Sequence, residues 1–177
     1  LSHSSAASDV YKRQHQISLE KLRDFAANIG SKDWLKETRE NCLDLIFSVA
    51  VEPELPSGLV LVYDYPACQA ALSQIDRNSK GHSISRRFEV FYNKIEVGNG
   101  YFELLDAVDQ NGRFDVDIES RRGDGKPFVR KDKKFIDAIE AGLPPCAGIA
   151  MGVDRLLMGM LGSASIDEVI SFSWPRT

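Results

Sequence analysis

Apolar residues recur at helical spacing in the first third of the chain. Between residues 18 and 28 they return every three to four positions, with Ser18 as a suitable N-cap and Gly30 as a suitable stop, which predicts an amphipathic helix. A second helical pattern covers residues 33–50 and cannot continue through Pro53. Two helices are therefore expected before the first strand.

The middle of the chain changes to the two-residue period of β-structure. Residues 59–63 are a short run of β-forming residues, which predicts a buried strand. Residues 86–106 alternate between apolar and polar positions and indicate two strands joined by a turn at Asn93 and Lys94.

This hairpin has an apolar face and an acidic face. The expected register pairs Val90 with Val97 and places Glu89 opposite Gly98. Glu89 then lies diagonal to Glu96, roughly 7–8 Å away, which is close enough for both carboxylates to bind one cation. The alternative is that they are two exposed acids on the surface of the sheet. The apolar face, on which helices are expected to pack, carries Phe88, Val90, Tyr92, Ile95 and Val97.

The last third alternates between helix and strand. Helical patterns cover residues 109–122 and 131–141, and residues 146–151 are small and apolar, as in a buried strand. Gly152 then opens a further helix, whose apolar residues are expected to point inward. The predicted fold class is α+β, with an antiparallel sheet flanked by helices.

Composition is that of a packed globular domain. The 177 residues are 43% hydrophobic and carry 22 Lys and Arg against 26 Asp and Glu, a net charge of −4, which disfavours a surface that coats nucleic acid. Cys42, Cys68 and Cys146 form no metal-binding or redox pair, and no apolar run suits a signal peptide or membrane span, so a cytoplasmic protein without a membrane partner is expected. Residues 1–14 are Ser-rich and aperiodic and are expected to be a disordered or non-native tail.

Two stretches resemble class II aminoacyl-tRNA synthetases of the lysine type, and among them the elongation factor P β-lysine ligases. RFEVFYNKIEVGNGYFELLDAVDQNGRF (residues 87–114) is similar to the strand pair that floors the ATP and amino-acid site. GLPPCAGIAMGVDRL (residues 142–156) is similar to the third class II motif, a small-residue strand that leads into a helix with an arginine in its first turn. The resemblance implies that residues 15–177 are the C-terminal part of a class II catalytic domain.

The resemblance implies that the chain activates an amino acid with ATP and Mg²⁺. Glu89 and Glu96 would hold Mg²⁺, while Glu96, Val97, Gly152 and Arg155 would contact ATP, with Arg155 as the catalytic cation. The alternative for Arg155 is an exposed arginine paired with an acid such as Asp154.

The resemblance also assigns the amino-acid pocket. Glu103 would receive the side-chain ammonium of lysine or (R)-β-lysine, and Asn99 and Ala150 would line the same pocket. Asn99 is equally compatible with a purely conformational role in a bulge. Because Glu96 and Glu103 are seven residues apart, they would face opposite ways in an unbroken strand, so a bulge within residues 98–101 is expected to bring Glu103 onto the face of Glu96.

Details of sequence favour the ligases over the lysyl-tRNA synthetases. Ala150 stands where the synthetases have glycine, and YPACQAALSQ and the ending FSWPR also resemble the ligases. The implied reaction transfers lysine or β-lysine to a lysine of elongation factor P, and tRNA is a partner only if the chain is instead a synthetase fragment. A non-catalytic paralogue or assembly half-domain is the third hypothesis. The first and second class II motifs are missing, so the chain is expected to be a fragment that is incomplete as an enzyme and forms a homodimer at full length.

Overall fold

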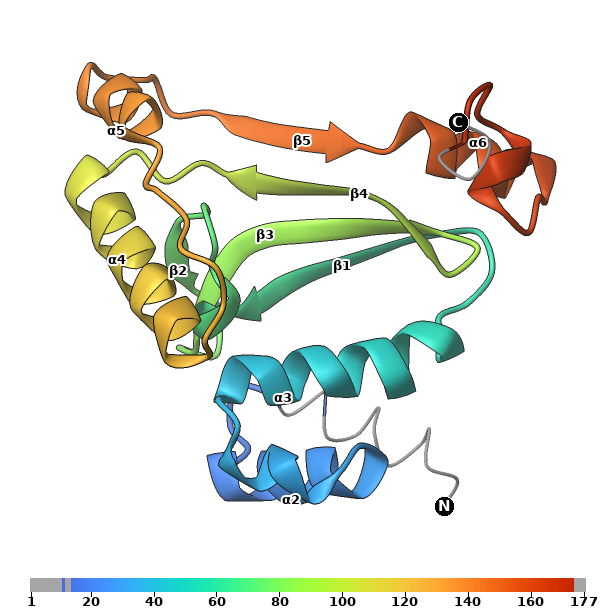
Figure 1. Cartoon of the computed structure of the whole chain (residues 1–177), viewed down its shortest axis with the longest axis horizontal. Helices are drawn as coiled ribbons and strands as arrows, with labels where there is room; N and C mark the ends of the chain where they lie inside the picture. The colour runs from blue at the N-terminus through green and yellow to red at the C-terminus, as the bar shows by residue number, and fades with distance from the viewer. Residues whose placement is uncertain (1–10, 12–13, 174–177) are drawn as a thin grey trace.

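The computed structural model describes residue 11 and residues 14–173 and confirms the α+β fold (Figure 1). The helices are α2 (Leu19–Ile29), α3 (Arg39–Ile46), α4 (Ala107–Gly123), α5 (Lys133–Glu140) and α6 (Val153–Leu161). The strands are β1 (Leu59–Pro66), β2 (Ile75–Arg77), β3 (Ser83–Tyr92), β4 (Ile95–Phe102) and β5 (Ala147–Met151). Within this part of the chain, no helix is long and apolar enough to cross a bilayer.

The two N-terminal helices start where side-chain caps permit. Ser18 caps α2 by accepting a hydrogen bond from the backbone N–H of Lys21, as the sequence predicts. The second predicted helix is divided, because Thr38 caps a new helix by accepting from the N–H of Asn41. Residues before this cap form the 3-10 turn Lys32–Lys36, and α3 continues into the π-helical turn Phe47–Val51. The predicted tail lies mostly outside the described residues.

All five strands form one antiparallel sheet. Its order is β1-β3-β4-β5, and β2 pairs with the start of β3. The turn between β3 and β4 has positive φ at Asn93 and at Lys94, 48° and 69°, which matches the type I′ hairpin turn that the sequence predicts. Strand β2 was not predicted, because its three residues are all exposed and lack an apolar pattern.

The register shows that Val97 is a β-bulge. Phe91 pairs with Glu96 but Val90 pairs with Gly98, so Val97 has no partner on β3. The expected pairing of Val90 with Val97 is therefore wrong, and so is the expected bulge within residues 98–101, which pair regularly. A bulge does shift the alternation of side chains along β4, as predicted, but it lies at Val97, one residue before the predicted range.

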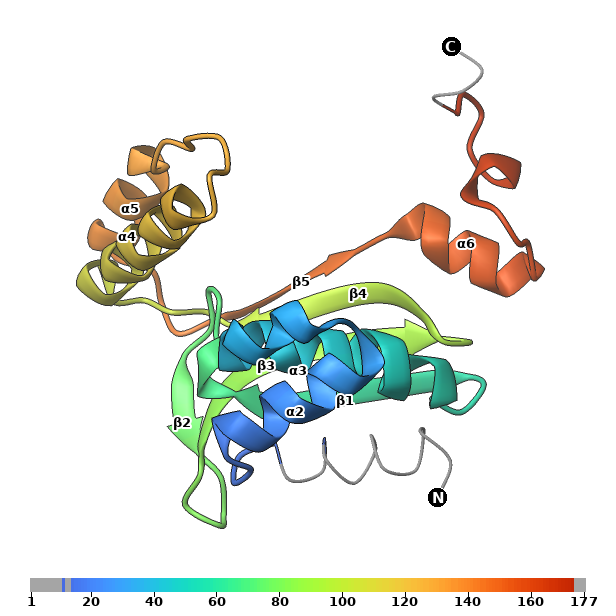
Figure 2. The same ribbon diagram turned by 60° about the horizontal axis from the view of Figure 1, so that its bottom comes forward.

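Helices α2 and α3 cover the face of the sheet that carries Phe91, and not the face with Phe88 and Val90 (Figure 2). Phe91 is 1% exposed and belongs to the same core cluster as Leu43 and Ile46 of α3. The prediction that helices pack on the other face is wrong for α2 and α3, since their contact comes from Phe91, a large aromatic residue among the acids, together with Val60 and Val62 of β1. Helix α6 does approach the other face, where Gly159 lies against the ring of Tyr92.

The other face of the sheet stays largely exposed in the described part of the chain. Leu61 of β1 and Ile149 of β5 are each 54% exposed, and every residue of β5 is exposed. Strand β5 was predicted to be buried, but it pairs only with β4 among the described strands, and its other edge is open. Val153 and Met160 of α6 are also exposed, contrary to the expectation that they point inward.

Candidate functional site

Three predicted site residues form one row across the sheet. Glu89 of β3 lies directly opposite Asn99 of β4, which lies directly opposite Ala150 of β5. Because directly paired residues share a face, all three project to the side on which α2 and α3 pack. Glu96 pairs with Phe91, two residues after Glu89, and so projects from the same face. The structure therefore brings the two predicted metal-binding carboxylates and part of the predicted amino-acid pocket together.

Most of the predicted site lines one cleft of about 370 Å³ where β4 and β5 meet the start of α6. Val97, one of its lining residues, is only 2% exposed, so a ligand would meet its backbone and not its side chain. The predicted residues in this cleft are Glu96, Val97, Asn99, Ala150, Gly152 and Arg155. Glu89 and Glu103 lie outside it.

Arg155 reaches from the first turn of α6 across to β4. Its Nη1 lies 3.3 Å from the backbone oxygen of Glu96 and 3.6 Å from Oε2 of the same residue. The guanidinium thus points to the acidic side of the hairpin, as expected, and its acidic partner is Glu96 instead of Asp154. The pair is about half exposed, so its contribution to stability is small. Such a weakly held guanidinium remains available to an anionic ligand.

Glu89 is held more tightly than the sequence suggests. One carboxylate oxygen forms an ion pair with Arg87, and the other accepts a hydrogen bond of 2.6 Å from the hydroxyl of Tyr65. Arg87 also donates to the backbone oxygen of Gln69 and stacks on the ring of Tyr65, 4.5 Å from its centroid. Arg87 and Tyr65 were missed as site residues, although Arg87 stands two positions before Glu89 and so shares its face.

The acids beside Glu89 form a second, smaller hollow under α3. It is lined by Asp44 and Glu52 from the helical segment and by Glu89 and Glu96 from the sheet. Burial and then the nearby charge of Glu89 raise the pKa of Glu96 above its ordinary value, while Arg155 opposes this shift. Burial also raises the pKa of Glu52, and the charges of Glu96 and Glu89 act in the same direction. This part of the site gathers four acids, and the cations beside them are Arg87 and Arg155.

Glu103 follows the end of β4 and is half-buried. Its backbone N–H donates to the oxygen of Cys146, 3.0 Å away, which ties it to the segment that enters β5. A Cβ atom placed on Gly148 would lie 2.7 Å from Oε1 of Glu103. Gly148 therefore makes the space that the Glu103 carboxylate occupies, a role that sequence reasoning missed. Since Gly148 pairs with Tyr101, the carboxylate lies on the face of Tyr101, Asn99 and Glu89.

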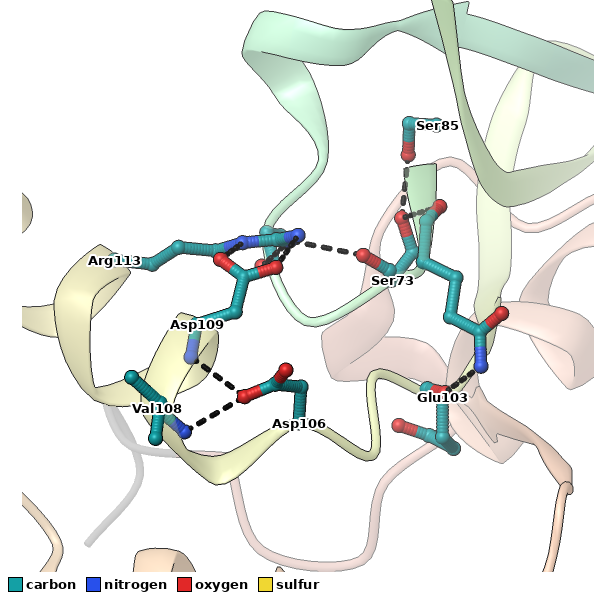
Figure 3. A network of polar contacts seen from close by, with 9 residues as sticks. Ser73, Ser85, Glu103, Asp106, Val108, Asp109 and Arg113 are labelled. Atoms are coloured by element: carbon teal, nitrogen blue, oxygen red, sulfur yellow. Dashed lines mark hydrogen bonds and ion pairs between the residues drawn. The ribbon is translucent and has the colours of Figure 1, made fainter. Parts of the chain in front are cut away.

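A polar network holds the chain on the other side of Glu103 (Figure 3). Ser73 forms a β-bridge with Glu103, and the side chain of Gln74 donates to the backbone oxygen of Glu103. The hydroxyls of Ser73 and Ser85 are 2.6 Å apart and fully buried. Glu103 is thus fixed between residues 72–74 and Cys146, in a position that its sequence pattern alone did not determine.

Comparison with known proteins shows the family of this chain. The family model of class II tRNA synthetases (D, K and N) matches residues 9–176. The elongation factor P–(R)-β-lysine ligase of Avibacterium paragallinarum is 41% identical over 157 residues, which are 88% of this chain and 48% of the relative. The ligases of Salmonella paratyphi B and Salmonella heidelberg are each 40% identical over 158 residues, with the same coverage. The chain spans about half the length of these relatives.

Proposed function

This chain belongs to the class II tRNA synthetases (D, K and N), and we propose that it supplies about half of an active site that activates lysine or (R)-β-lysine with ATP. The observation that carries the proposal is the row of Glu89, Asn99 and Ala150 across three strands, with Glu96 and Glu103 projecting from the same face. A purely structural sheet has no need to gather three carboxylates on a partly covered face, where each loses hydration.

The proposed reaction has two steps. A carboxylate oxygen of the amino acid attacks the α-phosphorus of ATP, the bond to the bridging oxygen breaks, and pyrophosphate leaves. The amino group of an acceptor lysine then attacks the acyl carbon, forming an amide as AMP leaves and the amino group loses a proton. The protein catalyses the first step chiefly by positioning the reactants and by stabilising charge on the phosphates. Arg155 is proposed to contact the nucleotide phosphates, and its half-exposed position at the cleft supports this role.

The acidic residues fit a divalent cation that accompanies ATP. Mg²⁺ usually takes only one or two protein carboxylates, with water and phosphate oxygens as its other ligands. Glu96 is the better donor, because among the described residues its carboxylate has only the long contact with Arg155, whereas both oxygens of Glu89 already accept hydrogen bonds. Among the described residues, no group of three or more possible ligands forms a metal centre of its own. A bound Mg²⁺ would neutralise phosphate charge.

Glu103 is proposed to select the substrate by its side-chain ammonium. The carboxylate lies over Gly148, on the face shared with Asn99 and Ala150, so an amino acid bound along this row would extend its side chain toward Glu103. A half-buried carboxylate gains stability from a cationic partner. Glutamate at this position therefore favours a lysine-like side chain over a neutral one.

The acceptor proposed for this chain is a lysine of elongation factor P. The support is that the relatives, 40–41% identical to the chain, are elongation factor P–(R)-β-lysine ligases. The alternative acceptor is tRNA, which the family as a whole supports through its synthetases.

A hybrid enzyme tests the proposed function. In it, the half of the Avibacterium paragallinarum ligase that this chain does not match is joined to this chain at the boundary of the alignment. We expect ATP–pyrophosphate exchange that depends on lysine or (R)-β-lysine from the hybrid, and little from the 177-residue chain alone. Transfer of radiolabelled amino acid to elongation factor P, and not to lysine tRNA, would support the ligase, whereas transfer to the tRNA alone would support the synthetase. A folded hybrid without amino-acid-dependent exchange would contradict both.

A further inference from the structure

The segment that fixes Glu103 is itself held by one side chain of α4. Arg113 donates through Nη1 to the backbone oxygens of Ala71 and Ser73, at 2.9 and 2.8 Å (Figure 3). Its Nε and Nη2 donate to the two oxygens of Asp109, one turn earlier on the helix, at 3.1 and 3.0 Å. The planar guanidinium is therefore fixed in orientation by Asp109 while it binds the loop.

The loop needs such support. Ala71 has a φ of 47°, in the left-handed region that residues with a Cβ rarely adopt. Ser73 is fully buried, and its backbone oxygen points away from Glu103. Arg113 gives a charged donor to that oxygen and to the oxygen of the strained Ala71, so one side chain satisfies both groups.

The loop in turn determines where Glu103 lies. The N–H of Gln74 donates to the oxygen of Phe102 and the N–H of Leu104 donates to the oxygen of Leu72, each at 2.9 Å. These two bonds flank the bridge between Ser73 and Glu103 and fix the Glu103 backbone on one side. The other side is fixed by Cys146, so the backbone from which the carboxylate reaches over Gly148 keeps its position while the loop stays in place.

We propose that Arg113 is a positioning residue that sets the place of the Glu103 carboxylate, and through it the affinity of the site for the substrate's side-chain ammonium. Arg113 does not itself touch the cleft. The structural half of this inference concerns the chain alone, and its link to substrate rests on the function proposed above.

Amide hydrogen exchange of the 177-residue chain tests the structural half. In Arg113→Gln, exchange at Gln74 and Leu104 should become at least about tenfold faster, while amides that link β1 and β3 keep their rates. The matched control is Arg122→Gln, which removes a long ion pair from an exposed arginine on the same helix and should change none of these rates. Unchanged exchange at Gln74 and Leu104 in Arg113→Gln would overturn the positioning role whether or not the chain has any enzymatic activity.

Kinetics of the hybrid enzyme test the link to substrate. Arg113→Gln should raise the KM for lysine roughly tenfold, and by no more than about 100-fold, while the KM for ATP changes little. A residue needed only for folding would instead lower the fraction of active enzyme and leave both KM values unchanged, which would overturn the link. If the unsubstituted hybrid is folded but inactive, the proposed function fails, while the exchange measurement still decides the structural half.

Discussion

Glu89 of β3 lies directly opposite Asn99 of β4, and this pairing exists because Val97 bulges out of the ladder two residues earlier. Without the extra residue, Glu89 would face Gly98, as a regular hairpin register requires. The bulge shifts the phase of β4, so Asn99, Tyr101 and the Glu103 carboxylate project from the face of Glu96. A single irregular residue thus determines which side chains share the site.

The pH dependence of stability should report the acidic hollow. The raised pKa of Glu96 means that the folded chain binds its proton more readily than the unfolded chain. This contribution to stability is fully present below the ordinary pKa and is lost as the pH rises through the raised value. Glu96→Gln, which cannot ionise, should therefore gain stability relative to the unsubstituted chain as the pH rises from about 4 to 7. Urea unfolding at several pH values measures this difference, and a difference that is constant or falls with pH would contradict it.

Gly148 should tolerate no side chain if Glu103 is to keep its position. Gly148→Ala would place a methyl group 2.7 Å from Oε1 of Glu103 and displace the carboxylate. In the hybrid enzyme, the KM for lysine should rise by roughly 10- to 100-fold, with little change in the KM for ATP. Gly123→Ala, at the end of α4 and outside the cleft, is the matched control for this selective effect, because its new Cβ would meet no atom within 4 Å. Equal KM values for lysine in Gly148→Ala and the unsubstituted hybrid would remove Gly148 from the pocket.

Phe91 should be the main energetic link between the sheet and the two N-terminal helices. It is 1% exposed and its ring lies 5.7 Å from that of Phe47, between centroids. Phe91→Ala should cost about 3–5 kcal/mol in the free energy of unfolding, measured with urea. Leu61→Ala, on the exposed face of neighbouring β1, should cost less than about 1 kcal/mol. Similar losses in the two variants would show that α2 and α3 do not depend on this contact.

The sequence predicted the secondary-structure elements better than their packing. Ser18, Gly30 and the pair Asn93–Lys94 act locally, through caps and a turn, so the segments that they delimit were recognisable without tertiary information. The position of the bulge was not recognisable from the sequence, because several residues around Gly98 tolerate a bulge. Which of them forms it depends on the pairing with β3. The exposure of β5 was also missed, since a pattern of small apolar residues indicates burial but cannot show whether both neighbouring strands are present.

The supporting residues of the site were the least predictable part. Tyr65 holds Glu89 across 24 residues of sequence, and Arg87, two residues before Glu89, is itself anchored to Gln69 across 18 residues. Arg113 holds the loop beside Glu103 by a contact with Ala71 across 42 residues. No local pattern encodes these long-range contacts. The family resemblance pointed to the carboxylates as candidates, because they stand in recognisable motifs. The structure was needed to show how their positions are maintained.

The most direct measurement of the central claim compares lysine with norleucine, which has a side chain of similar length without the ammonium group. In the hybrid enzyme, lysine should support ATP–pyrophosphate exchange far better than norleucine, and Glu103→Gln should reduce the kcat/KM for lysine by roughly 10–150-fold, the effect of losing a charge-assisted hydrogen bond. The KM for ATP should stay nearly constant, since Glu103 lies outside the cleft that contains Arg155. Equal use of lysine by the unsubstituted hybrid and by Glu103→Gln would contradict the claim that this carboxylate selects the substrate.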